Sequence, residues 1–156
     1  MKSLVRIGLL LLLAAGYIQC SEKRAVSITP ARPERGQQVT ITYDCSASDA
    51  KLSAEDKIAI QFSYSTLYDL PYELPLKKNG TKWEATFTLP RYAVYAAFYF
   101  KSGDSIDRPA PDKHYELTVY SDGKPIENAS LYKAYSLSAQ MGKSDYLEYF
   151  QSKLYE

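Results

Sequence analysis

The chain is poor in the residues that build most catalytic and metal centres. It contains one histidine, His114, and two cysteines, Cys20 and Cys45, with no CxxC pair. A redox dithiol or zinc knuckle needs paired cysteines, and a catalytic triad needs a histidine beside an activated nucleophile. No serine lies in a nucleophile-elbow motif. We therefore predict that the protein is not an enzyme and binds neither a metal ion nor another cofactor.

The chain also lacks an excess of charge of either sign. It has 19 Lys and Arg residues against 18 Asp and Glu residues. Residues 1–19 contain only two charges, Lys2 and Arg6, so 17 basic and 18 acidic residues remain without them. A nucleic-acid-binding domain presents a strongly basic face, and a disordered tail shows a run of like charges. We predict no nucleic-acid partner.

The apolar run near the N-terminus is short. It covers residues 8–16 and follows the basic Lys2 and Arg6, whereas a membrane-spanning helix needs about 20 apolar residues. Cys20 follows this run and is itself followed by polar chain, an order that resembles a bacterial lipoprotein signal, although Gln19 and Tyr17 replace the usual small residue and leucine. That resemblance implies cleavage after residue 19 and a diacylglycerol on Cys20. A signal cleaved near residues 14–16, or a retained anchor, remains an alternative.

Tyrosine is abundant, with fifteen copies against the single Trp83. Tyrosine suits half-buried strand faces, because its ring packs while its hydroxyl stays in water. Apolar and polar residues alternate with the period of a β-strand in several segments. The residues predicted to point inward are Val39, Ile41 and Tyr43; Ile58, Ile60, Phe62 and Tyr64; Trp83, Ala85, Phe87 and Leu89; Val94, Ala96, Phe98 and Phe100; and Tyr115, Leu117 and Val119.

Turn residues separate these strands. Asn79-Gly80 predicts a hairpin with a type I′ turn, and Asp122-Gly123 predicts the turn after the last strand. Pro71 and Pro75 restrict residues 65–75 to an edge strand or a loop. Six or seven strands without intervening helices predict an antiparallel β-sandwich over residues 37–126. Residues 20–36 are expected to form a tether that contains a first short strand at 25–29.

The pattern changes after residue 125. Leu131 and Tyr135 lie at helical spacing, and Gly142 can end a helix. Ser144 can cap a second helix that carries Tyr146, Phe150 and Leu154 on one face. We predict a helical hairpin over residues 127–156, too short to be stable alone and therefore packed on the sandwich or on a partner. It would also fit the start of a truncated helical-repeat region.

The order of motifs adds a resemblance to known modules. GQQVTITYDC, NGTKWEATFTLP and AVYAAFYFKSGDSID occur in the order seen in the immunoglobulin-like starch-binding modules of carbohydrate-binding families 25 and 53. Residues 25–130, with DGKPIENA near their end, are more similar to the N-terminal sandwich of bacterial lipoproteins that continue into helical repeats and a thioredoxin-like domain. The resemblance implies an all-β immunoglobulin-like antiparallel sandwich with a short C-terminal α-helical pair.

That resemblance also implies a function. We expect a non-catalytic lipoprotein module that is anchored in a bacterial envelope membrane and serves protein interaction or domain spacing, with another envelope protein as its partner. Carbohydrate binding is an alternative function. Because the chain carries no thioredoxin-like region, a further alternative is that it is the N-terminal fragment of a redox lipoprotein. The expected location is the periplasm or the cell surface.

Two sets of tyrosines are candidate binding residues. Tyr95 and Tyr99 alternate with the inward residues of their strand, so we expect them to form an exposed partner face. Tyr64, Tyr68 and Tyr72 could stack on the rings of an α-glucan-like carbohydrate, because flat aromatic faces suit the apolar faces of sugars. The alternative for this second set is ordinary packing and loop tyrosines.

The remaining polar candidates favour structural roles. Asp104, Asp107 and Asp112 could ligate calcium through carboxylate oxygens, but their spacing favours a solvated turn. His114 is expected to be a surface strand residue, and Cys45 a small buried thiol at the end of its strand.

Overall fold

The structure is a computed structural model that describes residues 24–52 and 57–140. The predicted signal peptide, Cys20 and the predicted second helix with Tyr146, Phe150 and Leu154 lie outside the described residues. Those predictions are therefore untested by the structure.

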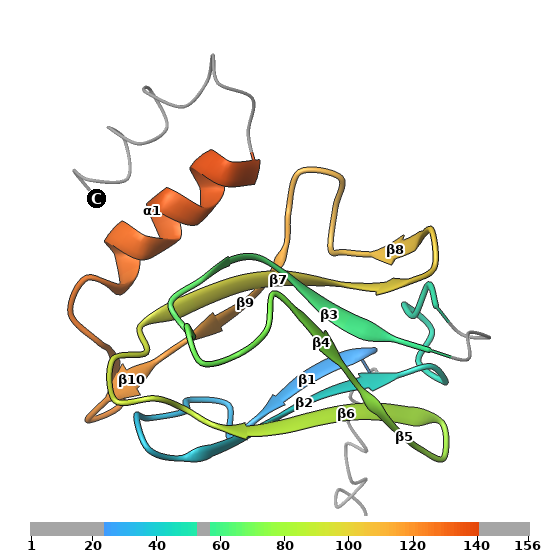
Figure 1. The fold of residues 1–156 in the computed structure, drawn as a ribbon, viewed down its shortest axis with the longest axis horizontal. Helices are drawn as coiled ribbons and strands as arrows, with labels where there is room; N and C mark the ends of the chain where they lie inside the picture. The colour runs from blue at the N-terminus through green and yellow to red at the C-terminus, as the bar shows by residue number, and fades with distance from the viewer. Residues whose placement is uncertain (1–23, 53–56, 141–156) are drawn as a thin grey trace, which may run out of the picture.

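Two antiparallel sheets face each other (Figure 1). The first contains, in spatial order, β1 (Val26–Thr29), β2 (Gln38–Asp44), β6 (Lys82–Thr88) and β5 (Lys77–Asn79). The second contains β4 (Glu73–Pro75), β3 (Ala59–Ser65) and β7 (Tyr95–Ser102), and both β8 (Ser105–Asp107) and β9 (Tyr115–Thr118) pair with the far edge of β7. A small ribbon of β10 (Tyr120–Ser121) and β11 (Lys124–Pro125) leads into helix α1 (Ala129–Gln140).

This strand order is that of an immunoglobulin-like sandwich. The order β1-β2-β6-β5 matches strands A, B, E and D, and β4-β3-β7-β9 matches C′, C, F and G. The predicted all-β sandwich with a C-terminal helix is confirmed, whereas the second helix of the predicted pair lies outside the described residues. One boundary differs, because β1, which was assigned to the tether, pairs with β2 from Val26↔Tyr43 to Thr29↔Thr40 and is an edge strand of the first sheet.

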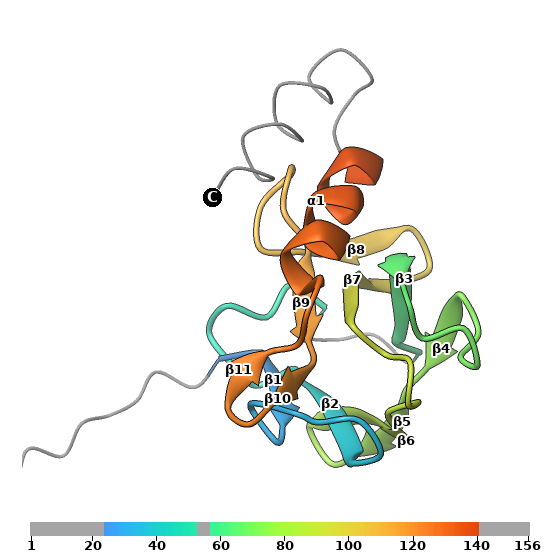
Figure 2. The same cartoon turned by 90° about the vertical axis from the view of Figure 1, so that its left-hand side faces the viewer.

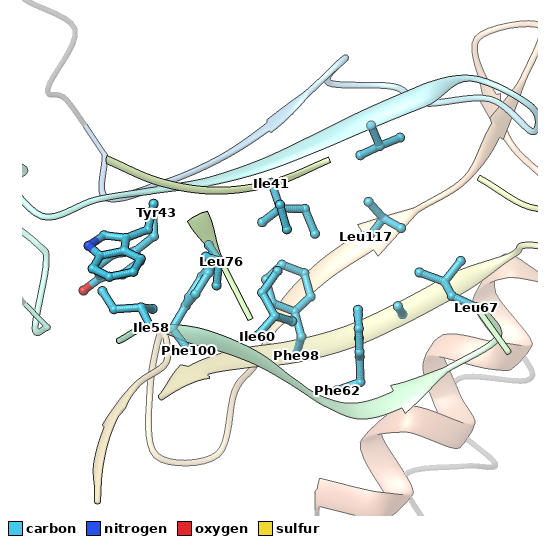
Figure 3. Close-up of a cluster of buried hydrophobic side chains, with 14 of the residues drawn as sticks. Ile41, Tyr43, Ile58, Ile60, Phe62, Leu67, Leu76, Phe98, Phe100 and Leu117 are labelled. Carbon is cyan, nitrogen blue, oxygen red and sulfur yellow. The ribbon is translucent and has the colours of Figure 1, made fainter. Parts of the chain in front are cut away.

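The core lies between the sheets and follows the predicted alternation (Figure 3). Ile41, Phe98, Phe100 and Leu117 have no exposed surface, and neither do Val39, Tyr43, Ile60 and Val119. Burying a side chain of this size stabilises a fold by about 1.5–3 kcal/mol. The period-two pattern therefore correctly identified the inner face of each main strand, with two exceptions. Val94, predicted to point into this core, immediately precedes β7 and packs instead in a second buried cluster with Tyr95 and Ala129.

The other exception is Tyr64, which lies beyond a β-bulge. Phe62 pairs with Phe98 and Tyr64 with Ala97, so Ser63 is an extra residue in β3. Because side chains alternate along a strand, one extra residue moves every later side chain to the opposite face. The prediction that Tyr64 points into the main core is therefore wrong: it packs against the second cluster, on the outer face.

The predicted hairpin forms between β5 and β6, but its turn lies one residue later than expected. Asn79 pairs with Lys82, so the two loop residues are Gly80 and Thr81, and Gly80 has a φ of +63°. Glycine at the first loop position is the pattern of a type II′ turn. The two positive φ values of a type I′ turn occur instead at Asp122 and Gly123, at 51° and 73°.

Helix α1 covers part of the outer face of the second sheet (Figure 2). Val94, Tyr95, Ala97 and Ala129 form a second buried cluster. The Lys133 ammonium also lies 2.8 Å from the Glu116 carboxylate on β9. Tyr95 is only 1% exposed. The prediction that Tyr95 forms an exposed partner face is therefore wrong, because the helix packs over the start of β7.

Candidate binding surface

Five tyrosines from four segments of the chain gather beside helix α1. We call them the tyrosine cluster: Tyr64, Tyr68, Tyr92, Tyr132 and Tyr135. The Tyr68 and Tyr92 rings stack, with centroids 5.7 Å apart and planes 29° apart. On the helix side, the Tyr132 ring lies 6.5 Å from Tyr64 and 6.3 Å from Tyr135.

Three of the five tyrosines are exposed. Tyr68 is 74% exposed, and Tyr92 and Tyr135 are each 38% exposed. Tyr64 is partly buried between them, and burial together with the nearby Tyr68, Tyr132 and Tyr135 raises its pKa to about 12. Tyr64 therefore links the loop tyrosines to the helix tyrosines.

Two loops that carry this surface are joined by Thr66. Its buried hydroxyl oxygen accepts hydrogen bonds from the N–H groups of Val94 at 2.9 Å and Tyr95 at 3.1 Å. The same hydroxyl lies 3.0 Å from the Tyr95 carbonyl, to which it donates. Tyr68 follows Thr66 closely in the β3–β4 loop and Tyr92 precedes Val94, so one buried side chain fixes both halves of the stacked pair. A fixed surface loses less entropy on binding.

The raised pKa of Tyr64 gives a testable pH dependence. The folded-state pKa lies above the ordinary value of 10, so folding favours the protonated phenol. The stabilisation from Tyr64 is present in full below pH 10 and is lost as the pH rises through about 12. In an ultraviolet titration at 295 nm, Tyr64→Phe should remove a tyrosine that ionises near pH 12, and a loss confined to lower pH would contradict this.

Tyr72 lies in a different neighbourhood. It is 68% exposed, and its carbonyl accepts hydrogen bonds from the Phe62 N–H at 3.0 Å and the Gln61 side chain at 3.1 Å. Within residues 24–52 and 57–140 its ring has no aromatic partner. The structure therefore brings Tyr64 and Tyr68 of the predicted stacking set together and leaves Tyr72 apart.

Sequence reasoning did not single out three members of the cluster, Tyr92, Tyr132 and Tyr135, although the helical region that holds the last two was expected to pack on the sandwich or on a partner. Tyr132 and Tyr135 are three residues apart, a spacing that places them on one face of a helix, so that signal was available. Nothing in the sequence around Tyr92 indicates that the β6–β7 loop meets the β3–β4 loop.

The other predicted partner residue, Tyr99, lies on the part of the sheet that α1 leaves uncovered. Its ring centroid is 5.4 Å from that of His114. The His114 Nδ1 lies 2.6 Å from the Ser63 hydroxyl, a serine–histidine contact that the sequence did not suggest. Burial, and then the charge of Arg108, lower the pKa of His114. A general base must become an imidazolium during acyl transfer, and this environment disfavours that charge.

The aspartates considered as calcium ligands do not form one site, and the solvated turn expected for them is wrong for Asp107. Asp107 is fully buried and accepts hydrogen bonds from Tyr43 at 2.6 Å and Tyr115 at 3.1 Å. Asp104 and Asp112 are exposed. Across the described ranges, no group of three or more His, Cys, Asp and Glu side chains is arranged to hold a metal ion.

Cys45 is a partly buried free thiol whose Sγ donates to the Leu52 carbonyl at 3.5 Å. Burial and the neighbouring Asp44 raise the pKa of this thiol. Only the thiolate is a strong nucleophile, so the environment lowers the reactivity of Cys45 at neutral pH.

In the described part of the chain, no helix is long and apolar enough to cross a membrane.

The fold and this surface together define the class of the protein. It is an immunoglobulin-like sandwich with a helix packed on its C′CFG sheet and an exposed tyrosine cluster beside that helix. Neither a protein-family model nor a curated protein sequence matches the chain.

Proposed function

We propose that this protein is a non-catalytic, lipid-anchored binding module of a bacterial envelope, which holds a partner protein through the tyrosine cluster. The observation that carries the proposal is the gathering of five tyrosines, from two loops, β3 and α1, on one exposed surface. Tyrosine is enriched at protein interfaces, because it gives a large contact area with few rotatable bonds and a hydroxyl for hydrogen bonding.

The polar surroundings of the cluster support the same reading. The Tyr92 hydroxyl bonds the Asp69 carboxylate, which raises the pKa of Tyr92. Lys133 of α1, the helix that carries Tyr132 and Tyr135, forms an ion pair with Glu116 of β9 in the second sheet. An aromatic centre with charged groups around it is the usual arrangement of a protein interface.

The second candidate function is carbohydrate binding, which the Tyr68–Tyr92 pair favours. Stacked rings with an adjacent carboxylate resemble a surface on which a sugar ring could lie, with Asp69 accepting a hydroxyl. Retardation in gels that contain amylopectin or other glycans distinguishes the two functions. Retardation that Tyr68→Ser removes would establish the carbohydrate function, and unchanged mobility would exclude it for the glycans used.

The experiment for protein binding is crosslinking of the full chain in its membranes, followed by quantitative recovery of its partners. Tyr68→Ser/Tyr92→Ser should reduce recovery of a specific partner by about 10- to 100-fold, as expected when aromatic residues at the centre of an interface are truncated. Tyr72→Ser is the control, because this tyrosine is 68% exposed, close to the 74% of Tyr68, but lies outside the cluster. Equal partner recovery from all three proteins would exclude the cluster as the binding surface.

A further inference from the structure

The sandwich has two chemically different ends. Tyr64 pairs with Ala97 near the start of β7, and Ala59 pairs with Lys101 near its end, so the tyrosine cluster marks one end of the sheets. The β5–β6 hairpin lies at the other end (Figure 1). It carries three exposed lysines, which we call the hairpin lysines: Lys77, Lys78 and Lys82.

The described chain begins at the end with the hairpin lysines. Val26 pairs with Tyr43, Tyr43 with Trp83, and Trp83 with Lys78, so these residues lie level across the four strands of the first sheet. The Ala25 carbonyl accepts the Asp44 N–H at 2.7 Å, and Asp44 in turn pairs with Lys82. Arg24, the first described residue, is exposed beyond this point.

The proposed anchor is close to this end along the chain. Cys20 precedes Arg24 by four residues. An extended chain spans at most about 3.6 Å per residue, so a lipid on Cys20 would hold this end within about 15 Å of the membrane surface. Charges interact across about 8–10 Å at physiological ionic strength, so the hairpin can reach the surface potential of anionic lipids.

The hairpin lysines are available for such an interaction. Within the described residues no ion pair occupies their ammonium groups. Lys78 lies over the Trp83 ring, with 5.4 Å from Nζ to the ring centroid. Two carboxylates lie nearby: Glu84 pairs in register with Lys77 and accepts the Asn79 side chain at 3.3 Å, and Asp49 accepts the Ala25 N–H at 2.7 Å. Among the described residues, neither carboxylate lies within ion-pair distance of a hairpin lysine.

We propose that the hairpin lysines bind anionic lipid headgroups, so that the module rests on the membrane by this end and presents the tyrosine cluster away from it. The inference rests on the lipid anchor of the proposed function and adds the membrane-facing surface and the orientation.

Trp83 is the only tryptophan and lies beneath the hairpin, so it reports this contact directly. The full chain, purified from membranes, is reconstituted into vesicles of phosphatidylglycerol or phosphatidylcholine that contain a trace of dansyl-labelled lipid. Energy transfer from Trp83 to the label should be stronger in phosphatidylglycerol and should fall as salt is raised.

The variant is Lys77→Gln/Lys82→Gln, which keeps Lys78 over the Trp83 ring. Each lysine near an anionic surface increases binding about fivefold, so the ratio of docked to undocked protein should fall about 25-fold. Arg91→Gln/Lys124→Gln removes the same charge from exposed residues at the opposite end and should behave as the unmodified chain.

Equal energy transfer in the two lipids would overturn the proposal. So would energy transfer in phosphatidylglycerol that Lys77→Gln/Lys82→Gln leaves unchanged. Either result is expected if the hairpin lysines bind an acidic protein and not lipid headgroups. If the protein did not co-float with either kind of vesicle in a density gradient, it would lack the lipid anchor, and the proposed docking of the hairpin lysines would also be excluded. The partner recovery that tests the tyrosine cluster is measured separately, so its failure is not confused with failure of lipid docking.

Discussion

Replacing Asp107 with alanine is expected to lower the free energy of unfolding by about 3–4 kcal/mol. The carboxylate is fully buried and accepts hydrogen bonds from the hydroxyls of Tyr43 and Tyr115 and from the Lys51 N–H at 3.1 Å. The substitution removes the acceptor and leaves those donors buried without it, which costs more than the hydrogen bonds themselves contribute. The Lys51 ammonium, 3.6 Å away, also loses its counter-ion.

The loss should be visible in thermal and urea unfolding. A change of this size corresponds to a fall in Tm of about 10–15 °C for a domain of this length. Asp104→Ala is the control, because Asp104 is exposed in the same part of the chain and should change stability by less than about 0.5 kcal/mol. If the two variants unfold alike, Asp107 does not hold the loop and the two tyrosines together.

The second large effect is expected at Tyr95, where serine should cost about 3 kcal/mol. The ring is buried under α1, and the Ser136 hydroxyl lies 3.5 Å from the Tyr95 hydroxyl. A cavity at this place removes the surface on which the helix packs, and a helix of this length is not stable alone. We therefore expect faster proteolysis between β11 and α1 as well as a lower Tm.

Tyr99→Ser is the matched control for Tyr95, since Tyr99 lies four residues further along the same outer face of β7, outside the cluster that α1 covers. It should cost about 1 kcal/mol or less, because Tyr99 remains partly in water, and it should leave proteolysis of the helix unchanged. If Tyr95→Ser left both the Tm and the proteolysis rate at those of the unmodified chain, the helix would not depend on this contact.

Much of the fold was predictable because the strands are amphipathic. Val39, Ile41 and Tyr43 alternate with polar residues and all point into the core, as predicted. Where the prediction failed, the cause was an interaction beyond the strand. Ser63 forms a β-bulge, although no Gly or Pro nearby indicates one. The turn predicted at Asn79-Gly80 lies one residue later, at Gly80-Thr81, because Asn79 pairs with Lys82.

The candidate site was less predictable than the fold. Tyr64 and Tyr68 were identified from their ring chemistry, and both belong to the cluster. Tyr92 joins them only because Thr66 ties two loops that are distant in sequence. Tyr95 was expected to be exposed because alternation describes one strand and carries no information on what packs over its outer face.

The sequence by itself determined the sandwich, since a period of two fixes which side chains of each strand are buried. It also determined the shortage of histidine and cysteine residues, and it predicts an export signal before Cys20. Only the tertiary structure decided which tyrosines are buried under α1, which gather on the surface, and which end of the sandwich carries the hairpin lysines. Those properties depend on contacts between segments distant in sequence, and no local pattern of residues specifies them.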